Sequence, residues 1–141
     1  MINPGPNPLP AGAATDVRVM TVDDQERFRG VARDVIEATS GFQCVGEAAS
    51  GEEALREFDR IAPELVLVDV RMPGLDGIEV ARRLHQSSPE TVVVLISIEE
   101  PADLPSVGKL TGGVPLVRKQ DFGPRLLRRI WKEYGGSLAA S

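Results

Sequence analysis

Five polar side chains stand at the ends of apolar runs of this sequence, and the carboxylates among them suit the binding of a metal ion. They are three carboxylates, one hydroxyl and one ammonium group: Asp23, Asp24, Asp69, Ser97 and Lys119. Three carboxylates within several ångströms repel one another, which a folded protein tolerates by raising a pKa or by binding a cation. Oxygen ligands suit a hard divalent ion, and Mg²⁺ characteristically takes one or two carboxylates and keeps waters at its other positions. We therefore expect a Mg²⁺ site if these residues converge.

The same groups also suit phosphoryl transfer. Aspartate is a competent nucleophile for this reaction and forms an aspartyl phosphate. A metal ion beside the carboxylate orients and neutralises the incoming phosphoryl group. Lys119 is then suited to bind a phosphoryl oxygen, and Ser97 is suited to donate a hydrogen bond to one. Metal binding and phosphoryl acceptance are thus the chemistry that these residue types predict.

The apolar runs before these residues are of the kind that form buried strands. They cover residues 17–22, 65–68, 91–96 and 116–118, and segments with helical periodicity lie between them. Short buried strands that alternate with helices are typical of a parallel sheet with crossover helices. In such sheets the binding site forms outside the carboxyl ends of the strands. The five polar side chains should therefore meet at one edge of the sheet.

From Val17 onward the pattern of strand followed by helix is repeated five times. A further strand is predicted near 43–48. Helices are predicted over about 26–38, from Ser50 to about Arg60, after the turn at 70–77, and over about 124–134. Ser50 and Glu53 form a capping box at the start of the second helix. The fourth helical segment, within residues 100–115, should be short or irregular, because proline costs a helix about 3 kcal/mol and glycine about 1 kcal/mol.

Composition limits the class of protein. A length of 141 residues fits one domain with a modest core. The net charge of −5 argues against direct nucleic acid binding. No apolar stretch approaches the roughly 20 residues of a membrane span, and no secretory leader is visible. Because the single Cys44 cannot form an internal disulfide, a reducing compartment fits, and we expect a cytoplasmic protein without membrane contact.

The two ends of the chain differ from its middle in composition. Residues 1–15 alternate proline with small residues and carry few large apolar side chains. Such a segment cannot bury a core, so we expect a disordered or polyproline-like arm. We assign residues 16–135 to one folded domain and residues 136–141 to a flexible tail.

The sequence around these polar residues resembles the receiver domain of two-component response regulators. The resemblance covers about residues 17–134, and its matching pieces are Val22-Asp23-Asp24, Asp69-Val70-Arg71-Met72-Pro73-Gly74-Leu75-Asp76-Gly77, Ile96-Ser97 and Lys119. It implies an α/β fold of the flavodoxin-like, doubly wound kind, with a five-stranded parallel sheet of strand order 2-1-3-4-5. Only about 22 residues follow Lys119, too few for a DNA-binding domain. The chain is therefore either a stand-alone receiver or one domain of a longer protein.

The resemblance implies a role for each acidic residue. Asp69 takes the position of the phosphoacceptor. Asp24 and Asp69 would bind Mg²⁺ directly, together with the main-chain carbonyl of Arg71. Asp23 would bind the ion through water. Such a domain is not an enzyme beyond Mg²⁺-dependent self-phosphorylation from a small donor and self-dephosphorylation.

The resemblance also implies partners and a switch. Ser97 takes the position of the switch hydroxyl and Lys119 that of the lysine that contacts the phosphoryl group. Ser97 alone would also fit a simple turn residue. The phosphoryl donor would be a sensor histidine kinase or a phosphotransfer protein, and the output would pass to an unknown downstream protein. A homodimer stays open.

Three residues depart from the usual receiver pattern, and all three lie in the signalling half. Leu116 replaces the switch aromatic, Ile98 replaces a small residue after the switch hydroxyl, and Gln120 replaces a proline after the lysine. Because a cis bond before a non-proline residue costs roughly 2.5–4 kcal/mol, we expect a trans bond between Lys119 and Gln120. These changes leave an alternative open, a receiver-like interaction domain whose output does not depend on phosphorylation. A hydrolase with an aspartate nucleophile fits poorly, because Arg71 stands where such phosphatases need a second aspartate.

Overall fold

The computed structural model describes residues 16–98 and 114–135 of the chain. The predictions of an N-terminal arm, a C-terminal tail and an irregular fourth helical segment concern residues that lie outside these ranges, apart from Val114 and Pro115.

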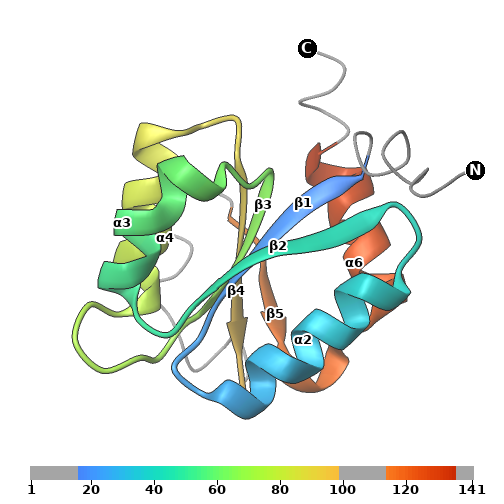
Figure 1. The fold of residues 1–141 in the computed structure, drawn as a ribbon, viewed down its shortest axis with the longest axis horizontal. Coiled ribbons are helices and arrows are strands. Elements are labelled where there is room, and N and C mark those ends of the chain that lie inside the picture. The colour runs from blue at the N-terminus through green and yellow to red at the C-terminus, as the bar shows by residue number, and fades with distance from the viewer. Residues whose placement is uncertain (1–15, 99–113, 136–141) are drawn as a thin grey trace, which may run out of the picture.

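The described residues form a five-stranded parallel sheet with the order β2-β1-β3-β4-β5 (Figure 1). Its strands are β1 (Val17–Val22), β2 (Phe42–Ala48), β3 (Leu65–Asp69), β4 (Val92–Ser97) and β5 (Leu116–Arg118). The predicted flavodoxin-like order 2-1-3-4-5 is therefore confirmed, and the predicted strands agree with the observed ones to within one or two residues.

Helices cover both faces of this sheet (Figure 1). One face carries α3 (Gly51–Ile61) and α4 (Gly77–Ser87), and the other carries α2 (Glu26–Ala38) and α6 (Pro124–Ile130). Alternate residues of the strands point to opposite faces, so each face has its own apolar core. Met20, Val66 and Val93 pack beneath α3 and α4, whereas Val19, Leu67 and Val94 pack beneath α2 and α6.

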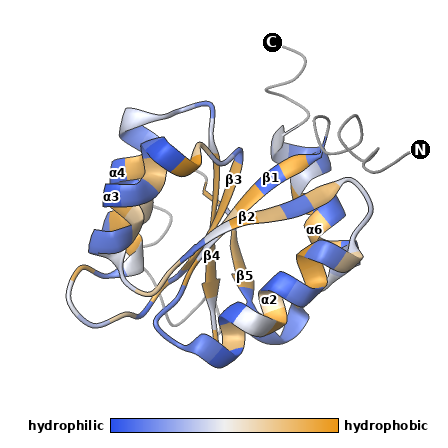
Figure 2. Cartoon of the chain, in the orientation of Figure 1, coloured by the Kyte–Doolittle hydropathy of each residue, from blue (hydrophilic) through white to orange (hydrophobic). Residues whose placement is uncertain are grey.

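The hydropathy of the chain follows these layers. Figure 2 shows the hydrophobic colours gathered in the strands and the hydrophilic ones along the outer sides of α2 and α3. The strands β3 and β4 are buried along their whole length. This agrees with their uninterrupted apolar sequences, because a strand covered on both faces has no solvent side that would need polar residues.

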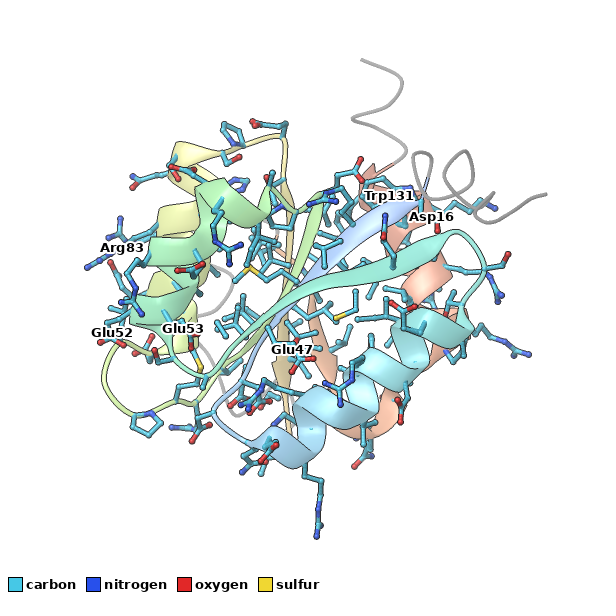
Figure 3. All side chains as sticks on the ribbon, viewed as in Figure 1. Asp16, Glu47, Glu52, Glu53, Arg83 and Trp131 are labelled. Carbon is cyan, nitrogen blue, oxygen red and sulfur yellow. The ribbon has the colours of Figure 1, made fainter. Side chains whose placement is uncertain are left out.

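Side chains fix where the helices after β2 and β3 begin. The hydroxyl of Ser50 accepts a hydrogen bond of 3.1 Å from the main-chain N–H of Glu53, as the capping box predicts. The Glu53 carboxylate accepts in return from the N–H of Ala49, one residue before the cap, at 2.8 Å. Both Glu52 and Glu53 lie at this end of α3 (Figure 3). Asp76 caps α4 in the same way by accepting from the N–H of Glu79 at 2.9 Å.

The last helix differs from its prediction. A single helix over about 124–134 was expected. In the structure α6 ends at Ile130 and continues as a π-helical turn, η3 (Trp131–Gly135). Because a π-helical turn contains more residues than an α-helical one, Tyr134 is rotated off the apolar stripe and is 37% exposed.

Candidate functional site

Three carboxylates meet at the carboxyl ends of β1 and β3. Asp23 and Asp24 follow β1, and Asp69 is the last residue of β3. Each offers an oxygen atom, and these oxygens all lie within 4.8 Å of one another. Asp23 and Asp69 are buried, whereas Asp24 is exposed. The structure therefore brings the predicted acidic residues together, with one of them open to solvent.

Lys119 places its ammonium group between the two buried carboxylates. Its Nζ lies 2.7 Å from Oδ2 of Asp23 and 3.5 Å from Oδ1 of Asp69. The lysine side chain is only 10% exposed. Lys119 is the first residue of the 3₁₀ turn η2 (Lys119–Asp121), directly after β5. The short edge strand β5 therefore positions the ammonium group of Lys119 beside the acidic cluster.

The environment of Asp69 disfavours its charged form. Burial of the carboxyl group is the main cause, and the neighbouring charge of Asp23 is the second. Lys119 acts in the opposite direction, and Asp24 adds a smaller upward contribution. Together they raise the pKa of Asp69 from its ordinary value of 3.8 to about 6. An added cation would relieve this cost by compensating the crowded negative charge.

The donor set fits a divalent cation that prefers oxygen. All three candidate ligands are carboxylates, and hard ions such as Mg²⁺ take ligands of this type. In addition, Oδ2 of Asp23 is fully buried, and among the described residues its partner is the Lys119 ammonium at 2.7 Å. Because a carboxylate oxygen can accept more than one hydrogen bond, Oδ2 could also accept from a metal-bound water. Arg71 lies two residues after Asp69, and the role of its main-chain carbonyl as a ligand stays a prediction.

The turn that carries Asp23 is held by main-chain contacts. The Asp23 N–H donates to the carbonyl of Ala48 at 3.0 Å. Its Oδ1 accepts from the N–H of Gln25 at 2.8 Å, which fixes the side chain and leaves Oδ2 facing Lys119. The Asp23 carbonyl accepts from Nη1 of Arg29 at 2.7 Å. The orientation of Asp23 is therefore set by β2 and by the first turns of α2.

Arg29 is itself held by a second residue that the sequence patterns did not indicate. Its Nε lies 3.4 Å from Oε1 of Glu47, and both side chains are partly buried. Glu47 extends from β2 toward α2 (Figure 3), where it also pairs with Arg33. A helical stripe reports which residues face the core, but it does not indicate which charged residues pair across a strand. The clamp formed by Arg29 and Glu47 is therefore visible only in the structure.

The region after Asp69 leaves no room for a side chain at the start of α4. The N–H of Gly77 donates to the carbonyl of Val70 at 3.0 Å. A Cβ at Gly77 would overlap the main-chain carbonyl oxygen of Asp69. The helix therefore begins directly against the end of β3, and only glycine allows this close approach.

Ser97 ends β4 at the same edge of the sheet. Asp69 pairs with Ile96, so Ser97 lies one residue beyond the level of Asp69 on the neighbouring strand. Ser97 in turn pairs with Arg118, which directly precedes Lys119. The serine is buried at 2% exposure. Its role toward a group bound to Asp69 stays a prediction.

The residues that depart from the receiver pattern occupy different environments. Ile98 is 77% exposed. Leu116 is partly buried against the core beneath α3 and α4. The bond between Lys119 and Gln120 is trans, as predicted, and no cis peptide bond occurs among the described residues.

An aromatic pair beside Lys119 was also missed by the sequence patterns. Nζ of Lys119 lies 4.6 Å from the ring centroid of Phe28, and the ring centroids of Phe28 and Phe122 are 6.3 Å apart. Phe28 also packs against the core beneath α2 and α6. Its position in the first turn of α2 places its ring beside the ammonium group of Lys119.

Comparison with known proteins identifies the family. The sequence model of the response regulator receiver domain matches residues 19–130, and the chain belongs to this family. Receiver domains of response regulators are generally signalling domains and not enzymes. No helix among the described residues is long and apolar enough to cross a membrane.

Several curated proteins are similar to the chain. The response regulator GacA of Pseudomonas viridiflava is 38% identical over 90 residues, which are 64% of this chain and 42% of that protein. UvrY of Escherichia coli K12 is 28% identical over 120 residues, or 85% of this chain and 55% of that protein. A protein-glutamate methylesterase/protein-glutamine glutaminase of Myxococcus xanthus is 37% identical over 127 residues, or 88% of this chain and 35% of that protein. The chain thus spans about half or less of the length of such relatives.

Solved structures give the same assignment. The receiver domain of the response regulator NarL of Mycobacterium tuberculosis is 30% identical, with a TM-score of 0.75, and 86% of this chain and 98% of that chain are covered. The response regulator domain of Thermotoga maritima CheB is 28% identical, with a TM-score of 0.72 and coverage of 83% and 95%. The curated relatives include response regulators and a protein-glutamate methylesterase, each matched over only part of its length. The similarity therefore defines the receiver domain and leaves its output open.

Proposed function

We propose that Asp69 accepts a phosphoryl group from a sensor histidine kinase or a phosphotransfer protein, with Mg²⁺ bound, and that the chain signals through a protein-protein surface. The observation that carries this proposal is the buried Asp69 carboxylate, which has two further carboxylates within 4.8 Å and the Lys119 ammonium at 3.5 Å. Membership of the receiver family supports the same reaction. We assign this role to residues 16–135 and place it in the cytoplasm.

In the proposed reaction an oxygen of Asp69 attacks the phosphorus of a phosphohistidine. The O–P bond forms while the P–N bond breaks, and the imidazole leaves with the electron pair of that bond. Mg²⁺, when bound by Asp24 and Asp69, supplies charge neutralisation for the phosphoryl oxygens and keeps Asp69 ionised. The raised pKa of Asp69, about 6, makes this second contribution useful, because the nucleophile must be deprotonated.

Two residues of the chain would receive the phosphoryl oxygens. Lys119 has only a short distance to move, since its Nζ already lies 3.5 Å from Asp69. Ser97 would donate its hydroxyl hydrogen from the end of β4. Both contacts exist only with a phosphoryl group in place, so both would favour the phosphorylated arrangement over the resting one.

Intact mass spectrometry tests this proposal. The chain is incubated with acetyl phosphate and Mg²⁺, and we expect the mass of one phosphoryl group to be added. The variant Asp69→Asn should stay unmodified, whereas Asp59→Asn, which changes an exposed aspartate on α3, should react like the original chain. An unmodified original chain under saturating donor, with Mg²⁺ binding shown separately, would favour the phosphorylation-independent alternative.

A further inference from the structure

The ammonium group of Lys119 has an aromatic neighbour in addition to its two carboxylates. The ring centroid of Phe28 lies 4.6 Å from Nζ, well within the distance of about 6 Å at which a cation is attracted to a ring face. The lysine side chain is 10% exposed, so little water competes for the ammonium. Lys119 is therefore held both by charge and by the face of a ring.

The ring of Phe28 is held in place by Phe122, which directly follows the turn η2 that contains Lys119. Phe122 follows η2 directly, and its N–H donates to the carbonyl of Lys119 at 3.2 Å. Its ring packs on that of Phe28 with a centroid distance of 6.3 Å and an interplanar angle of 54°, a tilted arrangement of the kind that aromatic pairs prefer. Both rings also pack against the core beneath α2 and α6. The backbone of η2 and the first turn of α2 are thus joined through this pair.

A lysine side chain has four rotatable bonds, and ordering it costs conformational entropy. In the resting site the ammonium already lies 2.7 Å from Asp23 and 3.5 Å from Asp69. A ring that favours this one placement reduces the entropy still to be lost when a phosphoryl oxygen arrives. A leucine at position 28 would fill similar space but would offer no ring face to the cation.

We propose that Phe28 is a positioning residue for Lys119, and that its ring holds the ammonium where it can contact a phosphoryl group on Asp69. The part that concerns the phosphoryl group rests on the proposed function. The part that concerns the order of the lysine does not. The aromatic face is the property that matters, so tyrosine at position 28 should preserve the effect and leucine should not.

The first test measures the order of the Lys119 side chain by NMR relaxation of its ε-methylene group in the unphosphorylated protein. We expect higher mobility in Phe28→Leu than in the original chain, and original order in Phe28→Tyr. Phe122→Leu, which removes the packing partner but leaves the cation contact, should show a smaller increase. Equal order in all four proteins would overturn the positioning role without touching the proposed function.

The second test is a double-mutant cycle with beryllofluoride, which mimics the phosphoryl group on an aspartate. Phe28→Leu should weaken beryllofluoride binding about three-fold when Lys119 is present. In a Lys119→Ala background the same change at Phe28 should have no effect, because the coupled partner is missing. An equal loss in both backgrounds would mean that Phe28 merely packs the domain, and would overturn the proposal. If the original chain does not bind beryllofluoride at all, the proposed function fails, and the relaxation measurement still decides the role of Phe28.

Discussion

Lys119 is closer to Asp23 than to Asp69. The distance from Nζ is 2.7 Å to Oδ2 of Asp23 and 3.5 Å to Oδ1 of Asp69. In the resting site the lysine is therefore paired mainly with Asp23, and the candidate phosphoacceptor Asp69 keeps a raised pKa. Phosphorylation would give the ammonium a second, more strongly charged partner on Asp69.

The first prediction concerns the two acidic neighbours of Asp69. Neutralising Asp23 should lower the pKa of Asp69, because the main charge that raises it is removed and Lys119 is freed to move closer. Asp24→Asn should lower it less, since Asp24 is the weaker of the two causes. Carboxyl ¹³C NMR titration of the metal-free variants measures both. A larger effect of Asp24→Asn would contradict the geometry of the site.

The second prediction concerns stability and pH in the absence of metal. Between pH 3.8 and about 6 the folded chain keeps a proton on Asp69 that the unfolded chain has released. Folding then takes up a proton at this site, so the contribution of Asp69 to the free energy of unfolding should fall as pH rises from about 4 to about 6. At 1.36 kcal/mol per pKa unit, the loss from this group is at most about 3 kcal/mol. Urea unfolding at a series of pH values measures it.

Two controls identify the group responsible for that pH dependence. Asp69→Asn should remove the decrease, because no ionisable carboxyl is left at this position. Excess Mg²⁺ should also flatten the curve, since a bound cation keeps Asp69 ionised in the folded state. A decrease that persists unchanged in Asp69→Asn would assign it to another group.

The third prediction concerns Mg²⁺ itself. Asp24→Asn should weaken Mg²⁺ binding by roughly ten-fold or more, the size of loss that changes around metal sites usually cause, and should stabilise the metal-free protein because repulsion is relieved. Calorimetry is the appropriate measurement. The sole tryptophan, Trp131, lines a cleft with Pro63 and Thr91 at the amino ends of the strands. Because the acidic cluster lies at the opposite ends of the strands, tryptophan fluorescence should respond poorly to Mg²⁺ binding. Unchanged affinity in Asp24→Asn would remove this residue from the metal site.

The fourth prediction concerns Gly77. A methyl group here would overlap the carbonyl oxygen of Asp69, so Gly77→Ala should destabilise the domain by roughly 1–3 kcal/mol, the usual cost of overpacking. It should also weaken Mg²⁺ binding, because the end of β3 must shift. Gly123→Ala is the matched control, since nothing lies within 4 Å of a Cβ there. Similar stability of the two variants by thermal unfolding would show that the approach of α4 to β3 is less close.

The fifth prediction concerns the clamp on the Asp23 turn. Arg29→Gln should cost about 1–2 kcal/mol of stability, because a charged hydrogen bond to the Asp23 carbonyl and a partly buried ion pair are lost together. Arg33→Gln removes an arginine that pairs with the same Glu47 but is 52% exposed, so its effect should be near zero. Chemical denaturation of both variants measures the difference, and equal costs would contradict a specific role for Arg29.

The position of the acidic cluster was predictable because it depends on strand order. Asp69 closes an apolar run that is buried on both faces, and residues at the ends of parallel strands meet at one edge. The position of Lys119 was predictable for the same reason, because it directly follows β5. The position of Ser50 was predictable from the capping box at the start of α3. In each case a local pattern determines the element, and the element determines the place of the side chain.

The contacts within the site were not predictable in the same way. The ion pair of Lys119 with Asp23 was not among the expectations, and the contact of Lys119 with a phosphoryl oxygen stays a prediction. Phe28 and Arg29 are neighbours in one helix, yet one contacts the lysine and the other the Asp23 carbonyl. Such pairings depend on distances between elements that are far apart in the chain, and periodicity contains no information on them. The π-helical turn at Trp131 was missed for a related reason, because no local signal in residues 124–134 marks the change of helical step.

The central claim is that Asp69 carries the phosphoryl group, and reductive trapping tests it most directly. After incubation with acetyl phosphate and Mg²⁺, borohydride reduces an aspartyl phosphate to homoserine, and peptide mass spectrometry locates the changed residue. We predict homoserine at position 69, and at neither position 23 nor position 24. Homoserine at another aspartate, or none at all in a protein shown to bind Mg²⁺, would contradict this account.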